Sequence, residues 1–286
     1  MTDSSQNGQL LVVATPIGNL GDISIRAQQA LIDADYIAAE DSRNSAKLLN
    51  HLDIKKKIVA LHEHNERQRS QTIISDCQKG AKVALISDAG TPLISDPGYF
   101  LVREALKAGI TVVPLPGPCA AIAALSVSGL ASDRFIFEGF LPAKSTARES
   151  KLETLCGLTS TIIFYESTHR IIDCLESMAK VFGEEREITL AKELTKIHEA
   201  VVNGKFRKII DWLKEQPERK KGEFVILVSG KDKTHHTPER AIEDENLMVC
   251  LLSELPLKSA SKIAAKITSR KKNYFYQLGL DLQQNS

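Results

Sequence analysis

Apolar and polar positions alternate in blocks along the first half of the chain. Short runs of β-branched and small apolar residues, typical of strands buried in a parallel sheet, are followed by stretches with apolar positions at helical spacing. The runs predict strands at residues 10–14, 36–39, 58–61, 82–86 and 111–114. The longer stretches predict helices at residues 24–34, 67–79, 99–108 and 120–128. Strands that alternate with helices predict an α/β fold.

The second half repeats this alternation. An aromatic-rich run at residues 134–140 is expected to close the first half as its last strand, and Leu141-Pro142-Ala143-Lys144 is interpreted as a hinge. Further strands are predicted at residues 161–165, 187–191, 199–202 and 222–228, and helices at 145–155, 206–214 and up to Phe182. A chain of 286 residues is long enough for two such domains, at residues 1–141 and 142–231, each with its own core.

The stretch from Ser87 to Gly98 joins a predicted strand to a predicted helix and is long and stiff for such a connection. Its prolines, Pro92 and Pro97, fix φ, its glycines admit conformations closed to other residues, and its aspartates supply carboxylates. Pro97 is expected in the first turn of the following helix. Ligands of open α/β sheets bind outside the carboxyl ends of the strands, so the stretch predicts a ligand loop; a well-capped connection is the alternative.

A second loop, Pro116-Gly117-Pro118-Cys119-Ala120-Ala121, leads into a helix of small residues. Small side chains at a helix N-terminus let a ligand approach backbone N–H groups that have no partner within the helix. Tight packing of the helix on the sheet explains the same residues, and both can hold. The loop is therefore a second candidate for ligand binding.

Charged residues follow several predicted strands. Glu40-Asp41-Ser42-Arg43 comes after the strand at 36–39, and Lys192-Glu193-Leu194-Thr195-Lys196 follows the strand at 187–191. The first cluster is consistent both with site residues and with a helix cap that carries a surface ion pair. Because such charged ends occur in both halves, we expect a cleft between the two domains.

Residues 239–286 are expected to form a small helical extension that resembles a helix-turn-helix module, after a polar linker at 231–238. Basic residues spaced four apart form a stripe along one helix face, and a second basic cluster with aromatic residues follows. These candidates for RNA binding are Lys258, Lys262, Lys266, Arg270, Lys271 and Lys272. A different face is expected to hold Leu257, Ala260, Ile263, Ala264 and Ile267. A charge stripe is often only a solvated face, but the aromatic residues favour nucleic-acid binding.

Composition excludes several classes of protein. The chain is 43% hydrophobic and 26% charged, as ordinary globular proteins are, and its net charge of +1 leaves nucleic-acid affinity to a local basic patch. Its five scattered cysteines argue against a disulfide framework and a zinc site and favour a reducing cytoplasm. The polar N-terminus lacks a signal core, and no apolar run approaches the roughly 20 residues of a membrane span.

Common cofactor and metal motifs are missing from the sequence. Neither the G-x-G-x-x-G dinucleotide fingerprint nor the G-x-x-x-x-G-K-[ST] P-loop occurs. His62 and His64 form an H-x-H pair in a polar stretch. Because no third ligand stands in register, a solvated or substrate-facing turn is favoured there over a metal site.

Six motifs occur in one order along the chain, at residues 15–20, 38–43, 87–98, 114–121, 164–170 and 193–196. Together they closely resemble the tetrapyrrole-methylase superfamily and, within it, a family of 2′-O-ribose cytidine methyltransferases of small-subunit ribosomal RNA. The resemblance covers about residues 10–280, and the tail looks like the helix-turn-helix extension of that family. Ser42 stands where that pattern has Thr, a mild departure that keeps a hydroxyl.

The resemblance implies that S-adenosylmethionine is held in the cleft between the two domains, largely by backbone contacts. The residues that would hold it are Asp88, Ala89, Gly90, Thr91, Pro92, Pro116, Gly117, Pro118, Cys119, Ala120, Tyr165, Ala191 and Gly222. The resemblance also implies a homodimer and a target in the decoding region of 16S rRNA in the small ribosomal subunit.

Methyl transfer to a ribose hydroxyl benefits from a carboxylate that takes up the hydroxyl proton. Asp41 and Glu193, at strand ends in opposite domains, are the catalytic candidates, and Arg43 is expected to orient the phosphate or ribose. Two other functions stay open. One is tetrapyrrole methylation by the same fold, which gives the basic tail no evident role. The other is a non-catalytic RNA-binding assembly protein, which uptake of the cofactor would distinguish from an enzyme.

Overall fold

The computed structural model describes residues 8–62, 64–231, 238–268 and 270–284. The chain divides after Lys231 into two compact units, and each is described by itself. The expected boundary at residue 141 lies within the larger unit, so the division of that unit into domains 1–141 and 142–231 stays a prediction.

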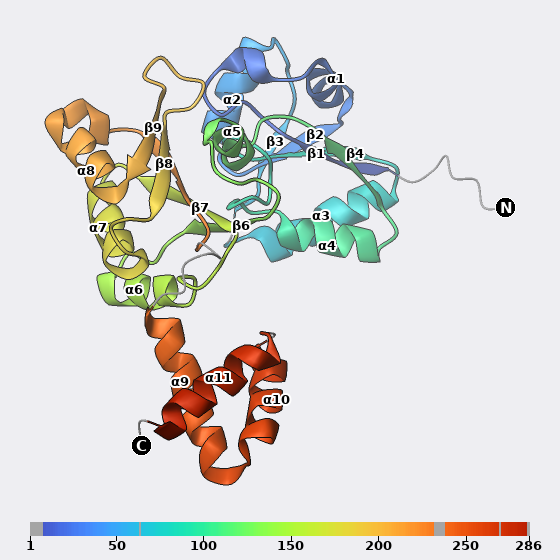
Figure 1. Cartoon of the computed structure of the whole chain (residues 1–286). Coiled ribbons are helices and arrows are strands. Elements are labelled where there is room, and N and C mark those ends of the chain that lie inside the picture. The colour runs from blue at the N-terminus through green and yellow to red at the C-terminus, as the bar shows by residue number, and fades with distance from the viewer. Residues whose placement is uncertain (1–7, 63, 232–237, 269, 285–286) are drawn as a thin grey trace. The chain divides into compact units, whose positions relative to one another are not determined.

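The first sheet of the larger unit is all parallel, as the buried apolar runs predict (Figure 1). Its strand order is β3 (Ile58–Ala60), β2 (Tyr36–Ala39), β4 (Lys82–Ile86), β1 (Gln9–Val13) and β5 (Thr111–Leu115). The helices that connect these strands are α1 (Ile25–Asp33), α2 (Ser42–His51), α3 (Glu66–Gln78) and α4 (Tyr99–Lys107), with a 3₁₀ turn η1 (Leu20–Asp22) before α1.

Alternate residues of these strands pack against different helices, so the sheet is buried on both faces. In β2, Ile37 and Ala39 share a core cluster with residues of α1 and α2, whereas Ala38 packs in a separate cluster with residues of α3 and α4. This arrangement makes three layers and explains why the strands read as continuous apolar runs instead of alternating ones. The carboxyl ends of β1, β2, β4 and β5 carry the loops that build the site.

The second sheet is mixed. Its strand order is β6 (Phe135–Phe140), β7 (Thr161–Ser167), β10 (Glu223–Val228), β8 (Glu187–Lys192) and β9 (Ala200–Lys205). Only β6 and β7 run parallel, and the other neighbours are antiparallel. One face is covered by α6 (Ser145–Glu153), α7 (Ile171–Phe182) and α8 (Phe206–Glu215), and η2 (Pro217–Lys220) follows α8.

The expectation that residues 134–140 close the first half as its last strand is wrong. This strand, β6, pairs with β7 at the edge of the second sheet, from Phe135 opposite Thr161 to Phe140 opposite Tyr165. The apolar composition of a strand predicts that the strand is buried, but it does not predict the sheet to which the strand belongs. The second sheet therefore begins before the predicted hinge.

Helix α5 (Ala120–Val127) joins the two sheets. It follows β5 of the first sheet, yet Ala121, Ala124 and Leu125 pack against Ile163, Val225 and other residues of the second sheet. Ile17, from the first loop of the chain, is packed against the same cluster. Because one helix fills the space between the sheets, the loops after both sets of strands face a common cavity.

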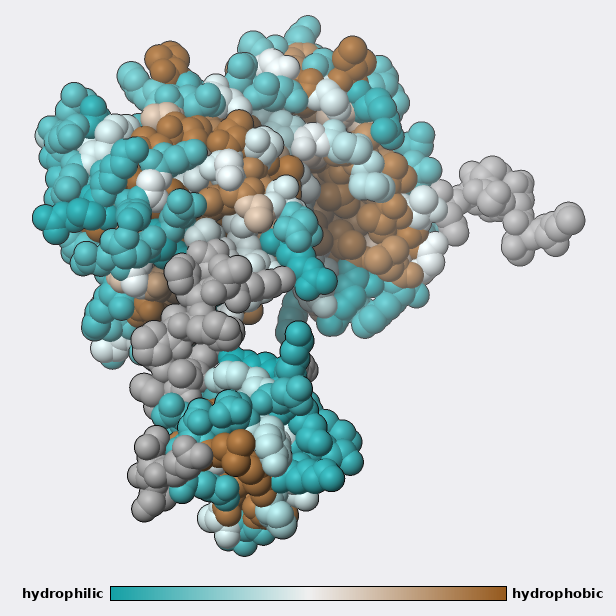
Figure 2. Space-filling view, viewed as in Figure 1, coloured by the Kyte–Doolittle hydropathy of each residue, from teal (hydrophilic) through white to brown (hydrophobic). Residues whose placement is uncertain are grey.

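Hydrophobic side chains also reach the surface of the larger unit, where they form brown patches in the space-filling view (Figure 2). Exposed large hydrophobic residues of this unit include Leu106, Ile122, Val127 and Phe140. Apolar patches of this kind mark surfaces that bind ligands or other proteins. No helix of the described residues is long and apolar enough to cross a lipid bilayer.

Pro97 is not in the first turn of α4, as the sequence predicts, but directly before the N-cap residue Gly98. The N-terminus of α4 is capped instead by a side chain from α3. Glu66 Oε1 accepts hydrogen bonds from the backbone N–H groups of Gly98 and Phe100, at 3.0 and 2.9 Å. A carboxylate suits this position because the helix dipole and unpaired N–H groups favour negative charge.

The smaller unit contains three helices in its described part: α9 (Pro238–Glu254), α10 (Leu257–Thr268) and α11 (Lys272–Gln284). Its core contains Met248, Ala260, Ala264 and Phe275. Most of the predicted linker at 231–238 lies outside the described residues. Ile263 and Ile267, which the sequence places on a different helix face from the lysines, are 37% and 64% exposed. The buried stripe is narrower and centred on Ala260 and Ala264.

Candidate active site

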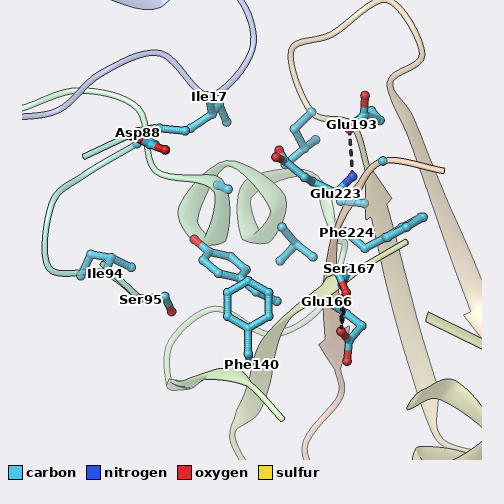
Figure 3. Close-up of a pocket in the computed structure, with 18 of the residues that line it drawn as sticks. Ile17, Asp88, Ile94, Ser95, Phe140, Glu166, Ser167, Glu193, Glu223 and Phe224 are labelled. Atoms are coloured by element: carbon cyan, nitrogen blue, oxygen red, sulfur yellow. Dashed lines mark hydrogen bonds between the residues drawn. The ribbon is translucent and has the colours of Figure 1, made fainter. Parts of the chain in front are cut away.

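A pocket of about 770 Å³ lies between the loops of the two sheets in the larger unit (Figure 3). Ile17, Asp88, Ile94 and Ser95 lie on one side, and Phe140, Ser167, Glu193 and Phe224 are among the residues on the other (Figure 3). The further lining residues are Glu40, Ala89, Gly90, Thr91, Asp96, Cys119, Ala120, Tyr165, Glu166, Thr168, His169, Ala191, Leu194, Lys196, Gly222, Glu223 and Val225. A volume of this size suits a nucleoside-sized ligand.

The loops that follow the strands of the first sheet form one side of the pocket, which we call the first wall, and the side formed by the second sheet is the second wall. The loops of the first wall are hydrogen-bonded to one another. The backbone of Thr15 pairs with that of Gly90 through two hydrogen bonds of 2.8 and 3.0 Å. The Thr91 hydroxyl donates to the carbonyl of Pro118 at 2.9 Å. Gly90 has a φ of +83°, and a Cβ there would lie 3.3 Å from the Ile17 side chain. The turn therefore needs glycine, and the loops form a rigid wall.

Both rims of the pocket carry strained backbone. Leu93 and Ser95 have φ angles of +74° and +66°, and Glu193 and Thr195 on the opposite rim have φ angles of +49° and +66°. L-residues adopt this left-handed region at a cost of about 1–3 kcal/mol each, and such strain gathers at functional sites. Ser95 and Glu193 line the cavity, and Leu93 and Thr195 are directly next to lining residues in the sequence, which supports its assignment as the functional site.

The second wall is tied to the first. The Tyr165 hydroxyl accepts a hydrogen bond from the N–H of Ala121 at 3.1 Å, and burial, with the nearby Cys119, raises its pKa. The backbone N–H of Asn19 donates to the Thr195 hydroxyl at 3.0 Å. These two contacts join residues that are far apart in the sequence, and they define the width of the cavity.

Carboxylates dominate the charge of the pocket. Burial raises the pKa of Asp96 to about 6, the carboxylates of Glu40 and Asp88 add to this shift, and a hydrogen bond from Ser87 opposes it. Burial also acts to raise the pKa of Glu193, but hydrogen bonds from Lys196 and from the Glu223 N–H outweigh it and lower that pKa. The pocket therefore contains one carboxyl group that titrates near neutral pH and another that stays ionised.

Glycine at position 222 makes room for Glu193. A Cβ on Gly222 would lie 2.5 Å from the Glu193 carboxyl group, so only glycine lets this side chain reach the Glu223 N–H, at 2.9 Å. The Lys196 ammonium then bridges Glu193 and Glu223, at 2.9 and 2.8 Å.

Most of the predicted cofactor residues line this one cavity. They are Asp88, Ala89, Gly90, Thr91, Cys119, Ala120, Tyr165, Ala191 and Gly222. The other four, Pro92, Pro116, Gly117 and Pro118, are not part of the lining. A Cβ on Gly117 would lie 2.9 Å from that of Ala14, which shows that the loop packs tightly against the end of β1.

Two of the three catalytic candidates lie outside the lining. Asp41 is the N-cap residue of α2 and forms an ion pair with Arg43 at 2.9 Å. Hydrogen bonds from the Arg43 side chain and backbone lower the pKa of Asp41 to about 2. In the structure, Asp41 and Arg43 therefore form a helix cap with a surface ion pair, which is one of the two interpretations that the sequence allows. Glu193, in contrast, lines the pocket. Their catalytic roles stay predictions.

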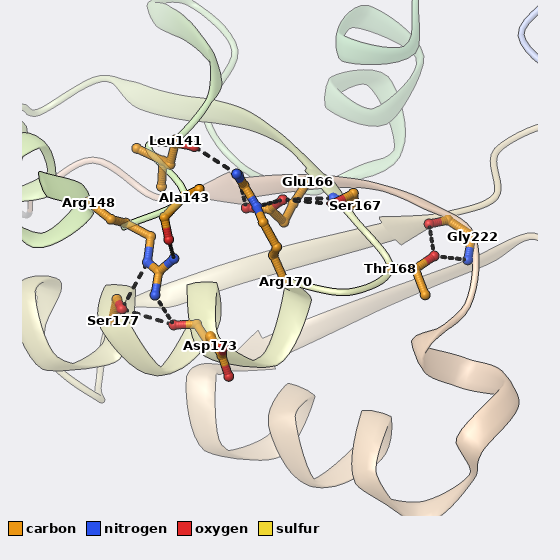
Figure 4. A network of polar contacts seen from close by, with 10 residues as sticks. All are labelled: Leu141, Ala143, Arg148, Glu166, Ser167, Thr168, Arg170, Asp173, Ser177 and Gly222. Carbon is orange, nitrogen blue, oxygen red and sulfur yellow. Dashed lines mark hydrogen bonds and ion pairs between the residues drawn. The ribbon is translucent and has the colours of Figure 1, made fainter. Parts of the chain in front are cut away.

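A polar network fixes the segment that the sequence suggests is a hinge (Figure 4). The Arg170 guanidinium donates to the carbonyl of Leu141 at 2.8 Å, and that of Arg148 donates to the carbonyl of Ala143 at 3.2 Å. Arg170 also forms two hydrogen bonds to Glu166, whose side chain is fully buried. Two arginines therefore hold the backbone of this segment, and its role as a hinge stays a prediction.

The same network reaches the pocket wall. Glu166 accepts a hydrogen bond from the N–H of Ser167 at 2.8 Å. The Thr168 hydroxyl donates to the carbonyl of Gly222 and accepts from its N–H, at 2.8 and 2.7 Å (Figure 4). Ser167, Thr168 and Gly222 all line the cavity, so this network positions one wall of the site.

Sequence reasoning missed Asp96 and Glu40 as pocket residues. Both belong to motifs that the sequence singles out. Their sequence positions do not show that these two carboxylates face the cavity, nor that the neighbouring Asp41 caps a helix instead. For Asp96 one signal was present: it belongs to the same stiff loop as Asp88, which the sequence already predicts to bind a ligand. In contrast, His62 and His64 do not line the pocket, and no group of three potential metal ligands occurs in the described part of the chain.

In the smaller unit, the structure separates the basic residues into two kinds. Lys258, Lys262 and Lys266 are exposed on α10, and Lys271 and Lys272 are exposed at the start of α11. Arg270 lies after α10 and not on its stripe, and its guanidinium is paired with the buried carboxylate of Asp244. The Tyr274 hydroxyl also bonds to Asp244, at 3.1 Å. Arg270 is thus engaged inside the unit.

Comparison with known proteins identifies the family. Residues 9–210 match the model of the tetrapyrrole (corrin/porphyrin) methylases, and residues 239–283 match the model described as the RsmI C-terminal HTH domain. The ribosomal RNA small subunit methyltransferase I of Haemophilus influenzae is 52% identical over 280 residues, which cover 98% of each chain. That of Escherichia coli O157:H7 is 50% identical and covers 98% of this chain and 97% of its own.

The chain belongs to the ribosomal RNA small subunit methyltransferase I family. The family resemblance seen in the motifs is confirmed, as is the α/β fold with a helix-turn-helix extension. The solved structure of the methyltransferase CobJ has the same fold, with a TM-score of 0.58 at 20% identity over 81% of this chain and 98% of that one. Like other members of the family, the chain is an S-adenosylmethionine-dependent methyltransferase.

The pocket fits this cofactor. Its floor is formed by small residues, Ala89, Gly90, Ala120 and Ala191, which leave backbone groups accessible, and by the ring of Tyr165. Its carboxylates suit a ligand that carries a positive sulfonium and an ammonium group. The lining residues would hold the cofactor by backbone contacts in the first wall and by aromatic and aliphatic contacts in the second.

Proposed function

We propose that this methyltransferase modifies the ribose 2′-hydroxyl of a cytidine in the decoding region of 16S rRNA. The support is similarity over nearly the full chain, at about half identity, to proteins named as ribosomal RNA small subunit methyltransferases. The match includes the helical extension, for which a small tetrapyrrole substrate would offer no evident partner. RNA therefore accounts for both units of the chain.

When bound, S-adenosylmethionine supplies a methyl group on a positively charged sulfur. This chain would have to hold the ribose hydroxyl in line with that methyl group and supply an acceptor for the hydroxyl proton. Fixing both reactants in a rigid cavity can supply roughly 7–11 kcal/mol of the barrier reduction. The bonded loops of the first wall and the Thr168–Gly222 contacts of the second provide this rigidity.

We assign the proton acceptor to Asp96. Its carboxyl group lines the pocket, and its pKa of about 6 is close to the value at which a general base is both ionised and able to accept a proton. Asp41, predicted from the sequence, is a weaker base because its pKa is about 2. Glu193 lines the pocket but is engaged with Lys196, which favours a role in positioning. Arg43 is exposed and paired with Asp41, so a phosphate that binds there would compete with that carboxylate.

The exposed lysines of α10 are proposed to contact RNA phosphates. Replacing Lys258, Lys262 and Lys266 together with alanine should raise the KM for RNA. It should also flatten the plot of log Kd against log salt by about 2–3, because each lost phosphate contact removes about 0.7–0.9 from the slope. Salt titrations of RNA binding measure this slope. An unchanged slope and KM would mean that the three lysines form only a solvated surface.

Arg270 should behave differently from those lysines. Because its guanidinium is paired with buried Asp244, replacing Arg270 with methionine is expected to destabilise the smaller unit more than it weakens phosphate binding. Thermal unfolding and RNA binding of the Arg270→Met variant separate the two effects.

The enzyme is proposed to work as a homodimer in the cytoplasm, where its ribosomal substrate is made. Exposed apolar residues of the larger unit, such as Ile122 and Val127, would be covered in a dimer. Sedimentation equilibrium of the purified chain tests this assembly, and a monomer at all concentrations would contradict it.

The decisive experiment is transfer of tritium from labelled S-adenosylmethionine. We expect label in small ribosomal subunits, at the ribose of one cytidine, and in naked 16S rRNA if assembly is not required. Label on a porphyrinoid but on no RNA would favour the tetrapyrrole alternative. Uptake of the cofactor without transfer to any of these substrates would contradict the proposal.

A further inference from the structure

A second cavity, of about 530 Å³, lies in the larger unit and shares Glu193 and Gly222 with the first. It is bounded by the end of β8, the loop at 193–199, the end of α8 and η2. Its other lining residues are Lys192, Ile197, His198, Glu199, Ala200, Trp212, Gln216, Glu218, Arg219 and Lys221. None of these residues is among the predicted site residues.

Lys192 is the unusual member of this set. It is the last residue of β8, where side chains alternate between the two faces of the sheet. Ala191 faces the first pocket, whereas Leu190 belongs to the core under α7 and α8. Lys192 therefore points to the α8 face, which agrees with its place in the second cavity, and only 5% of its surface is exposed.

The backbone of Lys192 pairs with Phe224 and Ala200 in the sheet, and its charge acts on Glu193. Its ammonium forms no hydrogen bond or ion pair among the described residues. The acids around it are engaged elsewhere. Glu193 pairs with Lys196 at 2.9 Å, Glu199 accepts a hydrogen bond from the N–H of Thr195 at 2.5 Å, and Glu218 is 4.0 Å from Lys221. The side chain of Lys192 is nearly buried, while its ammonium is not among the buried polar atoms that lack a partner and opens to the cavity. A cation held at a cavity without a hydrogen bond of its own is suited to an anionic ligand.

The wall beside Lys192 suits a nucleobase. The Arg219 guanidinium lies over the Trp212 ring, 4.6 Å from its centroid, and also pairs with Glu215 at 2.5 Å. A guanidinium held flat in this way offers its other face for stacking, as arginine planes do with unpaired RNA bases. Ile197, which is 98% exposed, stands at the rim of the same cavity.

We propose that the second cavity binds the nucleotide next to the methylation target, with its phosphate on Lys192 and its base against Arg219 and Trp212. The proposal rests on the proposed RNA substrate. Glu193 and Gly222 line both cavities, so the two cavities are adjacent. An RNA chain that crosses the rim between them would place neighbouring nucleotides in neighbouring cavities. The site thus helps to select single-stranded RNA over a small methyl acceptor.

The test is the Lys192→Met variant of the full chain, loaded with S-adenosylmethionine. Binding of a short fluorescein-labelled single-stranded RNA is measured by anisotropy in a salt titration. We expect the Kd to rise roughly 10-fold and the salt slope to fall by about 0.7, the value of one phosphate contact. The affinity for S-adenosylmethionine should be unchanged.

Thermal unfolding separates this role from a structural one. Methionine fills a similar volume without a buried charge, so the melting temperature of Lys192→Met should equal or exceed that of the unmodified chain. Lys192→Arg should restore RNA binding. Lys57→Met, at an exposed lysine next to the edge strand β3, is the matched control and should leave unfolding, RNA affinity and salt slope nearly unchanged.

The outcomes are distinct. Unchanged RNA affinity and slope in a folded Lys192→Met protein would falsify the proposal, and so would a lower melting temperature with normal RNA binding. Lys192-dependent binding of inorganic phosphate or cytidine monophosphate without any effect on RNA would also overturn it. If the unmodified chain transfers no methyl group to ribosomal RNA, the proposed function fails, whereas the anisotropy measurement still decides whether Lys192 binds RNA.

Discussion

Replacing Asp96 with asparagine should lower kcat by about 10²–10⁴-fold, which is the usual contribution of a general base. The affinity for S-adenosylmethionine should stay within a few-fold of the original, because asparagine keeps the shape of the side chain. Before substitution, kcat should rise with pH as the Asp96 carboxyl group, with its pKa of about 6, loses its proton, and it should level off above that pH. The Asp96→Asn variant should lack this rise.

Stability gives an independent check on this variant. The pKa of Asp96 is raised in the folded protein, so its ionisation destabilises the fold as pH rises from the unfolded value of 3.8 through about 6. Removing the charge should leave the protein at least as stable at neutral pH, so loss of activity cannot come from unfolding. Asp133→Asn, at an exposed carboxylate outside the pocket, is the control and should keep full activity.

A comparison with Asp41 and Glu193 decides between the carboxylates. Asp41→Asn removes the carboxylate but keeps a side chain that caps the helix, so its stability should change little, whereas Asp41→Ala also loses the cap and should lose about 0.5–2 kcal/mol. If kcat falls more in Asp41→Asn or Glu193→Gln than in Asp96→Asn, the proton acceptor is that residue and the assignment to Asp96 is wrong.

Replacing Arg170 with methionine should cost about 3–5 kcal/mol of unfolding free energy, because it leaves the Glu166 carboxylate buried without its partner. The Glu166 side chain has no exposed surface, and Arg170 supplies two of its hydrogen bonds, at 2.8 and 2.9 Å. The change also removes the hydrogen bond to the Leu141 carbonyl. Urea denaturation of the full chain measures the loss.

Two further variants make this prediction specific. The double variant Glu166→Gln, Arg170→Met should recover much of the lost stability, because the stranded charge is gone. Arg207→Met breaks an exposed ion pair with Asp211 and should change stability by less than about 1 kcal/mol. If Arg170→Met is no more destabilising than Arg207→Met, the buried pair does not stabilise this part of the fold.

Local patterns determined most of the elements and the identity of the family. Apolar runs located β1, β2 and β4 to within a residue, because both faces of the sheet are covered and every side chain of such a strand is buried. The stiff loops at 87–98 and 116–121 marked the carboxyl ends of β4 and β5, where the pocket lies. Proline, glycine and small residues report backbone demands directly, so these loops were readable from the sequence.

Only the tertiary structure decided which elements meet. Periodicity shows that β6 and α5 are buried, but their partners are strands more than twenty residues further along the chain, and no local pattern encodes such pairings. The same limit applies to charges. Asp41, Asp96 and Lys192 are alike in sequence as charged residues near strand ends or loops, and the fold makes one a helix cap, one a pocket carboxyl group and one a buried cation. The environment that sets their chemistry is assembled from distant segments, and it exists only once those segments are packed together.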